Sequence, residues 1–351
     1  MTGQSQYAEN KHLMIGDVSR MTLKNSTILV TGGTGSFGNA FVRKVLADSD
    51  PQRVIVFSRD EMKQWEMAKH FESDSRVRFF VGDVRDRDRM YRAVDGVDYV
   101  VHAAATKIVT TAEYNPFEAV KTNILGAMNV VDACIDMGVK KVVALSTDKA
   151  SSPINLYGAT KLASDKLFIS GNHYAGQKNT RFSVVRFGNV MGSRGSVIPF
   201  FLEKAKKGEP LPITDPSMTR FMITLTDAVS LVLEAFNDMM GGETYVRKIP
   251  SMGILDVAKA VAPEMDTHVV GIRPGEKLHE QMIGAEESSY TYEFDRYFKI
   301  LPTVNTWDRG ADLAVGGTQV APGFTYASDT NPVWMSVDEL RDWVSGEMLE
   351  K

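Results

Sequence analysis

Two residues one helical turn apart have the side chains needed for a redox reaction on an alcohol. Tyr157 and Lys161 form a Tyr-x-x-x-Lys motif, and residues four apart share one face of a helix. A lysine cation favours tyrosinate, so the phenol can take a proton from a hydroxyl while hydride leaves the same carbon. The same spacing occurs at residues 7–11 and 174–178. Only Tyr157 follows an apolar strand-like run and begins an apolar-periodic helix, so this pair is predicted to be the functional one.

A glycine-rich segment could bind the cofactor for such a reaction. TGGTGSFG, residues 31–38, has the spacing GxxGxxG between a strand-like run and a helix-like stretch. A tight turn needs glycine, a pyrophosphate needs bare backbone nearby, and a helix N-terminus supplies free N–H groups. FGNVMGSRG has a similar spacing after a later strand, but only the first motif ends the first strand of the alternating pattern. The residues predicted to hold the cofactor here are Gly32, Thr34, Gly35, Ser36, Phe37 and Gly38.

The next strand-like run ends at Ser58 and Arg59, where cofactor choice is made in this type of fold. An acidic residue there binds the ribose of NAD, and a basic residue holds the 2′-phosphate of NADP. Arg59 therefore favours NADP, although Asp60 follows it directly and a surface arginine is the alternative. Further cofactor contacts are expected where the later strands end, at Asp83, Val84, Ala103, Ala104, Ala105 and Lys107. Asp83 would accept from the adenine amino group, and the alanines would leave room for the cofactor.

The elements that must position these residues alternate between strands and helices. The strands are nearly continuous runs of Val, Ile and Phe, which is typical of a parallel sheet covered on both faces. This pattern predicts an α/β fold with a doubly wound parallel (Rossmann) sheet and a smaller α/β substrate domain. The strands are expected within residues 26–33, 53–60, 77–84, 97–105, 140–147 and 182–190, and the first helices within 39–49, 61–73 and 157–168.

The regular alternation of strand-like and helix-like segments ends at about residue 190, and Gly and Pro become frequent after it. We expect a flexible arm at 1–21, an NADP-binding domain at 22–190 with return segments around 224–248, and a substrate domain formed by 191–223 and 249–351.

Composition limits the class of protein. The chain has 351 residues, 43% hydrophobic and 24% charged, with a net charge of −4, so neither nucleic acid nor an anionic membrane is an expected partner. Its single cysteine, Cys134, cannot form an intrachain disulfide, and the six histidines lack metal-ligand spacing, so no metal is expected. With no apolar run long enough to span a bilayer and no signal-like start, a cytoplasmic protein is expected.

Several longer segments together resemble one enzyme family. They are TGGTGSFG, SRDE, EYNPFEAVKTNILG, STDKASSPINLYGATK, RFGNVMGSRGSVIPFF and RPGEKLHE. They are similar to the extended short-chain dehydrogenase/reductases, and most to the C5-inverting UDP-N-acetylglucosamine 4,6-dehydratases of pseudaminic acid biosynthesis. The resemblance runs from about Leu23 to VDELRDWV. STDKA with YGATK is its most specific part, because relatives acting on dTDP-glucose have Asp-Glu at Asp148-Lys149 and membrane-anchored ones have Met at Tyr157. KIVTT, residues 107–111, departs from the family, which usually has a proline there.

The resemblance implies an internal redox cycle with tightly bound NADP. Tyr157, held by Lys161, would deprotonate the 4-hydroxyl during oxidation at C4; a base would then remove the C5 proton, water would leave from C6, and hydride would return to C6. Lys149 is the expected C5 base, since burial beside Lys161 and a nicotinamide cation would lower its pKa. Asp148 could be the acid if its pKa is raised, and which of the two protonates the C6 oxygen stays open. Thr147 is expected to bind the sugar or Tyr157. Without Tyr157 nearby, Asp148-Lys149 would be taken for a solvated turn.

The same resemblance implies a UDP-sugar substrate. Arg220 and Arg273 would clamp the diphosphate, since a guanidinium fork matches phosphate oxygens, with surface ion pairs as the alternative for both. The remaining substrate contacts are expected at Lys107, Asn189, Val197, Lys204 and Glu276, with Glu276 on a ribose hydroxyl and Val197 beside uracil.

Two other functions remain open at this stage. A UDP-hexose 4-epimerase shares Tyr-x-x-x-Lys and the cofactor but needs no C5 base, which Asp148-Lys149 argues against. A non-catalytic NADP-sensing protein would usually have lost the tyrosine or the lysine. Family members are expected to form homo-oligomers, dimers or hexamers.

Overall fold

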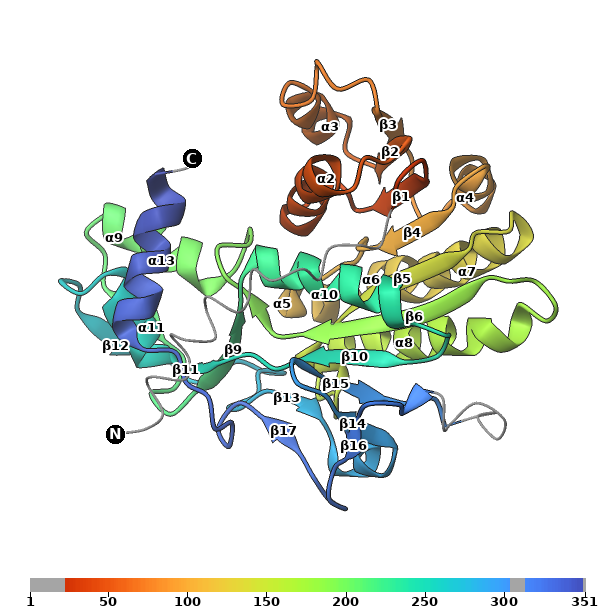
Figure 1. Ribbon diagram of the computed structural model, residues 1–351. Coiled ribbons are helices and arrows are strands. Elements are labelled where there is room, and N and C mark those ends of the chain that lie inside the picture. Colours follow the sequence, from red (N-terminus) through yellow and green to blue (C-terminus); the bar gives the residue numbers. More distant parts are fainter. Residues whose placement is uncertain (1–22, 304–312, 350–351) are drawn as a thin grey trace.

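The computed structural model describes residues 23–303 and 313–349. Within these residues the largest element is a ten-stranded sheet with the order β16-β14-β15-β10-β6-β5-β4-β1-β2-β3 (Figure 1). All pairs from β10 to β3 in this order are parallel. The parallel strands are β1 Thr27–Thr31, β2 Arg53–Ser58, β3 Val77–Val81, β4 Tyr99–His102, β5 Lys141–Thr147, β6 Arg181–Phe187 and β10 Thr244–Arg247. The strand order reverses between β1 and β4, which is where doubly wound sheets bind ligands.

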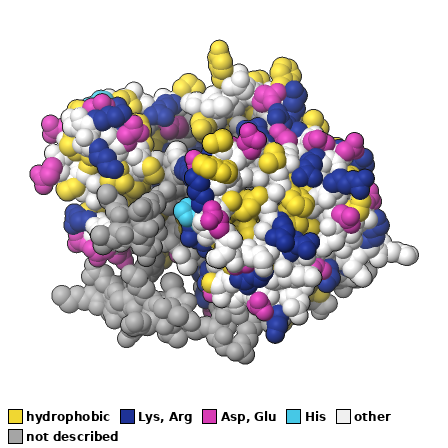
Figure 2. All heavy atoms as spheres, turned by 90° about the horizontal axis from the view of Figure 1, so that it is seen from above, with side chains coloured by type: hydrophobic (Ala, Val, Ile, Leu, Met, Phe, Trp, Pro, Cys, Tyr) yellow, Lys and Arg dark blue, Asp and Glu magenta, His cyan; other side chains and the backbone are white. Residues whose placement is uncertain are grey.

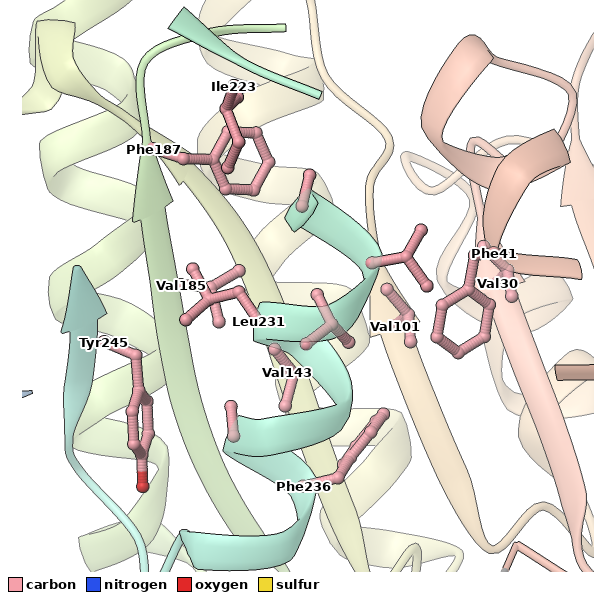
Figure 3. Packing of buried hydrophobic residues seen from close by; sticks show 14 of the residues in the cluster. Val30, Phe41, Val101, Val143, Val185, Phe187, Ile223, Leu231, Phe236 and Tyr245 are labelled. Atoms are coloured by element: carbon pink, nitrogen blue, oxygen red, sulfur yellow. The ribbon is translucent and has the colours of Figure 1, made fainter. Parts of the chain in front are cut away.

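Helices cover both faces of the parallel strands. One face carries α2 (Ser36–Asp48) and α10 (Leu225–Asp238), and the other carries α4 (Arg87–Val94), α7 (Gly126–Asp136) and α8 (Leu156–Tyr174). Successive strand residues point to opposite faces, which explains the continuous apolar runs. Figure 3 shows Val101, Val143 and Val185 on the side of α10, near Leu231 and Phe236, and Val30 beside Phe41 of α2. Leu29, Val100, Val142 and Val184 pack on the other side of the sheet. The doubly wound prediction is confirmed.

Shorter helices connect these elements. They are α3 Glu61–Ala68, α5 Val109–Tyr114, α6 Pro116–Val120, the π-helix η1 Lys121–Leu125 and the 3-10 helix η2 Asp148–Ala150. The η1 residue Asn123 is buried and its amide bonds the backbone of Thr106 and the hydroxyl of Thr160. Asn123 therefore ties the chain after β4 to α8, the helix that carries Tyr157.

Several short strands and helices after residue 188 lie outside the large sheet and form a second group. The strands are β7 Asn189–Val190, β8 Leu211–Ile213, β9 Thr219–Ile223, β11 Ser251–Gly253, β12 Thr267–Val269, β13 Gln281–Ile283 and β17 Tyr326–Ala327. The helices are α9 Val197–Lys206, α11 Ile254–Val261, the 3-10 helix η3 Ala285–Tyr290 and α13 Val337–Leu349. Figure 1 shows α9, α11 and α13 grouped at one end of the molecule, and their buried residues share a hydrophobic cluster.

Two stretches of the later sequence join the large sheet. The return segment around 224–248 supplies α10 and β10. The strands β14 (Thr291–Glu293), β15 (Tyr297–Ile300) and β16 (Thr318–Gln319) then extend the sheet in antiparallel fashion beyond β10, although the sequence suggested that 249–351 lies in the smaller domain. Strands of so few residues are too short for an alternating hydrophobic pattern to be recognised in the sequence. The division of the chain into domains stays a prediction, and the arm at 1–21 lies outside the described residues.

No helix in the described part of the chain combines the length and the apolar character that crossing a membrane would need.

Candidate active site

A cavity of about 1070 Å³ lies at the carboxyl ends of the parallel strands. Its walls combine the glycine-rich loop, the ends of β2 to β6, the start of α8, and residues 273–280. All cofactor residues predicted from the sequence lie in its lining: Gly32, Thr34, Gly35, Ser36, Phe37, Gly38, Ser58, Arg59, Asp83, Val84, Ala103, Ala104, Ala105, Lys107, Tyr157 and Lys161.

The glycine-rich loop has the shape that a pyrophosphate requires. Gly32 has φ of +65°, and a Cβ there would lie 2.8 Å from the backbone nitrogen of Ala104. At Gly38 a Cβ would lie 2.3 Å from the carbonyl oxygen of Gly33. The loop therefore presents bare backbone to the cavity just before α2 begins at Ser36, and this arrangement fits a dinucleotide.

Asp60 lies just after β2, where an acidic residue would favour NAD over NADP, but its carboxylate has a structural partner. The carboxylate of Asp60 caps α3 by accepting from Lys63 N at 3.0 Å, and it lies 2.8 Å from Lys63 Nζ. Arg59 and Lys63 both line the cavity, so two basic side chains are present at this corner. Sequence analysis missed Lys63, although its position one turn into a helix that follows Arg59 could have suggested it.

Asp83, at the end of β3, is already engaged with a neighbour. Burial alone would raise the pKa of Asp83, but hydrogen bonds from Arg85 hold it below its ordinary value. The guanidinium of Arg85 lies 2.6 Å from Asp83 Oδ2 and also pairs with Glu118. Accepting from an adenine amino group would therefore require Asp83 to share its oxygens with Arg85.

The Tyr-x-x-x-Lys pair lies at the start of α8, as predicted. Asn155 caps the helix by accepting from Gly158 N at 2.7 Å, and both Tyr157 and Lys161 line the cavity. The Nζ of Lys161 donates to the carbonyl of Leu145 at 2.8 Å. Burial raises the pKa of Tyr157 to about 12, and Lys149 together with a hydrogen bond to Thr147 opposes that rise. Among the charges that act on Tyr157, that of Lys149 lowers its pKa most, and the role that the sequence assigns to Lys161 stays a prediction.

The residues Thr147, Asp148 and Lys149 form a compact charged turn where β5 ends and η2 begins. Asp148 Oδ1 accepts from Thr147 Oγ1 at 2.8 Å and from Lys149 Nζ at 3.1 Å. Thr147 and Lys149 line the cavity, but Asp148 is 1% exposed and lies behind them. Burial raises the pKa of Asp148, as an acid requires, and its Oδ2 has no hydrogen-bond partner among the described residues.

Lys149 has a second carboxylate partner that sequence analysis missed. Its Nζ lies 2.9 Å from Oε1 of Glu280, which is itself in the cavity lining. Burial would lower the pKa of Lys149, but Asp148 and Glu280 together raise it above its ordinary value. In the chain by itself the two carboxylates outweigh the effect of burial, so a lowered pKa of Lys149 stays a prediction that depends on the bound cofactor.

The comparisons with known proteins agree with this arrangement. Residues 28–302 match the family described as polysaccharide biosynthesis protein. The chain belongs to the polysaccharide biosynthesis protein family. It is 53% identical over 324 residues to a UDP-N-acetylglucosamine 4,6-dehydratase (inverting) of Campylobacter jejuni, covering 91% of this chain and 97% of that protein. It is 43% identical over 283 residues to a UDP-glucose 4-epimerase of Rickettsia akari, covering 79% and 83%.

Solved structures of related proteins have the same fold. Pen from Bacillus thuringiensis superimposes with a TM-score of 0.84 at 38% identity, covering 93% of this chain and all of that one. DesIV, a dTDP-glucose 4,6-dehydratase from Streptomyces venezuelae with NAD and TYD bound, gives 0.65 at 25% identity, covering 72% and 86%. The resemblance to extended short-chain dehydrogenase/reductases is therefore confirmed.

In this member of the polysaccharide biosynthesis protein family, the other end of the cavity contains most of the predicted substrate residues. Asn189, Val197, Arg220, Arg273 and Glu276 all line it. Arg273 is exposed, and its backbone N–H donates to Glu276 at 3.3 Å. These residues come from β7, α9, β9 and the loop before β13, so the smaller elements close the cavity opposite the glycine-rich loop.

Two predicted cations, Arg220 and Lys204, are already bonded to other groups of the protein. Arg220 is 7% exposed, and its terminal nitrogens already donate to the backbone carbonyls of Thr219, Lys277 and Leu278. Arg220 lines the cavity, but its guanidinium is bonded to the protein, so it does not offer both terminal nitrogens to a diphosphate as expected. Lys204 lies outside the cavity lining, because its Nζ pairs with Glu209 at 2.5 Å while the neighbouring Glu203 faces the cavity.

Proposed function

We propose that this chain is a UDP-N-acetylglucosamine 4,6-dehydratase that inverts C5 and yields UDP-2-acetamido-2,6-dideoxy-β-L-arabino-hex-4-ulose. The observation that carries the proposal is that Lys149 and Tyr157 line one cavity beside the buried carboxyl of Asp148. Such a set provides one base for the C4 hydroxyl, another for C5 and an acid for the departing oxygen. The 53% identity to an inverting enzyme of this class supports it.

The first step needs Tyr157 to take the proton of the 4-hydroxyl. A nicotinamide cofactor, when bound, would accept the hydride from C4 and return it to C6. A proton from water, added to C5 on the face opposite the one that Lys149 deprotonates, would then complete the product, and Tyr157 would release the proton taken from the 4-hydroxyl to solvent. Lys149, whose charge lowers the pKa of Tyr157, assists by favouring tyrosinate. The ketone at C4 then makes the C5 proton acidic enough for a lysine amine to remove.

The elimination step can be balanced with three residues. Lys149 passes its proton to Asp148, 3.1 Å away, and the neutral amine then takes the C5 proton. Asp148 gives its proton to the hydroxyl of Thr147, which passes its own to the C6 oxygen, and that oxygen leaves as water. Asp148 is then a carboxylate and Lys149 an ammonium, as at the start. The relay is proposed because Asp148 lies behind Thr147 and outside the cavity lining.

We infer NADP as the cofactor. Arg59 and Lys63 line the corner where a 2′-phosphate would lie, and the carboxylate of Asp60 is occupied as a helix cap. The nucleotide of the substrate would lie at the opposite end of the cavity, with Arg273 on the diphosphate, Asn189 beside it, Glu276 on a ribose hydroxyl and Val197 near uracil. Arg220 would contribute its charge there, with both terminal nitrogens already bonded to backbone carbonyls.

The wider biological setting is also part of the proposal. We expect a cytoplasmic homo-oligomer, a dimer or a hexamer, whose product enters pseudaminic acid biosynthesis. On the face shown in Figure 2, acidic and basic side chains are interspersed, so this face has no large area of one charge for nucleic acid to bind.

A UDP-hexose 4-epimerase is the second candidate, because the UDP-glucose 4-epimerase of Rickettsia akari shares 43% identity with this chain. Mass spectrometry of the reaction with UDP-N-acetylglucosamine separates the two. A dehydratase gives a product lighter by one water, whereas an epimerase gives an isomer of unchanged mass. If several UDP-sugars remain unchanged by both mass and chromatography, the protein is instead a non-catalytic NADP sensor.

A further inference from the structure

Glu280 brings a buried negative charge to Lys149 from a distant part of the sequence. It lies directly before β13, a strand that contacts η2, and it is 1% exposed. Its Oε1 lies 2.9 Å from Lys149 Nζ and 4.0 Å from Arg220 Nε. Its Oε2 has no hydrogen-bond partner in the described part of the chain. A buried carboxylate with one free oxygen is costly to keep unless its charge has a purpose in the site.

The backbone of Glu280 is held firmly in place. Its N–H donates to Ser328 Oγ at 2.9 Å, and its carbonyl accepts from the N–H of Ser328 at 2.8 Å. The side chain therefore approaches Lys149 from a fixed point on the C-terminal part of the chain. The ammonium of Lys149 in turn lies between two carboxylates, Asp148 on its own turn and Glu280 opposite.

The charges around Lys149 balance when Glu280 is ionised. Two carboxylates, Asp148 and Glu280, face two cations, Lys149 and Arg220. The titratable and charged groups that act on this set, from every neighbouring element, are Asp148 on η2, Tyr157 on α8, Arg186 on β6, Arg220 on β9, and Lys277 and Glu280 before β13. Replacing Glu280 by a neutral residue would leave an excess of positive charge.

We propose that Glu280 is a positioning residue for Lys149, which holds the amine beside Asp148 at the cavity wall and sets the pH at which Lys149 can act as the C5 base. This inference rests on the proposed dehydratase function. Burial would raise the pKa of Glu280, but Lys149 and Arg220 lower it, so its charge is retained. That retained charge raises the pKa of Lys149 and so disfavours the neutral amine.

A pH profile separates this role from simple structural support. Removing the Glu280 charge lowers the pKa of Lys149, so the neutral amine forms at lower pH. In Glu280→Gln, the midpoint of the rising limb for C5 proton exchange in D₂O is expected to move down by roughly one pH unit. The maximum rate is expected to fall about tenfold, because the amine loses an anchor. Glu286→Gln, an exposed residue of the same segment, is the matched control and should keep both values.

The experiment follows C5 deuteration by NMR against pH for the wild-type protein and both variants. A profile for Glu280→Gln that coincides with that of Glu286→Gln would overturn the role of Glu280. If the wild-type protein does not dehydrate UDP-N-acetylglucosamine at all, the proposed function fails, and the pairing is then judged by stability alone.

The free energy of unfolding is the second measurement, and it tests the Glu280–Lys149 pair even if a variant is too unstable for the activity assay. Urea unfolding is compared for Glu280→Gln, Lys149→Met and the double variant. A direct pair predicts that the double variant loses less stability than the sum of the two single losses, because each single variant already removes the Glu280–Lys149 contact. Purely additive losses would contradict the pairing.

Discussion

The hydroxyl of Thr147 donates to Asp148 Oδ1 at 2.8 Å, so the buried acid reaches the cavity through a side chain that lines it. Asp148 itself is 1% exposed. In the proposed mechanism the acid for the leaving oxygen would therefore act through a relay, and the contribution of the relay can be measured separately from that of the base.

Replacing Thr147 by valine should separate removal of the C5 proton from loss of water. Thr147→Val keeps the shape of the side chain but removes the hydroxyl, and we expect dehydration to fall about a hundredfold, within the usual range for an acid-base group. Deuterium exchange at C5 should fall much less. Thr147→Ser retains a hydroxyl and should keep most of the dehydration. Equal losses of exchange and dehydration in Thr147→Val would argue against the relay.

Lys149→Met should abolish elimination while sparing oxidation at C4. The variant lacks the C5 base, so product formation is expected to fall by about 10²–10⁴-fold. Reduction of the bound cofactor, followed by its near-ultraviolet absorbance, should still occur, though more slowly because Lys149 also lowers the pKa of Tyr157. Lys166→Met, an exposed lysine on α8, is the control and should behave as the wild-type protein does. Full dehydration by Lys149→Met would exclude Lys149 as the base.

The oxidation at C4 should become faster as pH rises. Burial raises the pKa of Tyr157 to about 12, so at neutral pH the phenol is protonated and the tyrosinate fraction grows with pH. Single-turnover reduction of the cofactor, measured from mildly acidic to mildly alkaline pH, should show this rising limb. Tyr157→Phe should lose about 10²–10⁴-fold in this step. Tyr174→Phe, at the exposed end of the same helix, should lose nothing. A flat pH profile for the wild-type protein would contradict tyrosinate as the base.

Cofactor preference should depend on Arg59 and Lys63. Each alanine variant loses a cation at the corner of the cavity where a 2′-phosphate would bind. Affinity for NADP is expected to fall about tenfold or more, as for the loss of a charged hydrogen bond, with little change for NAD. Titration calorimetry on cofactor-stripped protein checks this, with the exposed Arg53→Ala as control. Equal losses of affinity for NAD and NADP would contradict a contact between these cations and the 2′-phosphate.

The sequence was most informative where a local rule dictates structure. Continuous apolar runs predicted β1 to β6, since a strand buried on both faces needs apolar residues at every position. The glycine loop and the place of Tyr157 and Lys161 at the start of α8 followed from motif and context together. These features depend on residues that are neighbours in the chain.

Features that depend on distant contacts were missed. Glu280 lies next to Lys149 only because β13 contacts η2, and no spacing in the sequence indicates that contact. The same cause explains why the raised pKa of Lys149 was not foreseen. Arg220 was expected to be a free clamp, but carbonyls of the segment before β13 occupy its nitrogens. Local sequence shows which residue types are present, but tertiary packing decides which charges meet.

The most direct test is proton NMR of the purified protein with UDP-N-acetylglucosamine in D₂O. We predict a 4-keto-6-deoxy product that carries deuterium at C5 and shows the couplings of the L-arabino configuration. A deuterated product of retained configuration would contradict inversion, and UDP-N-acetylgalactosamine in its place would contradict the dehydratase itself.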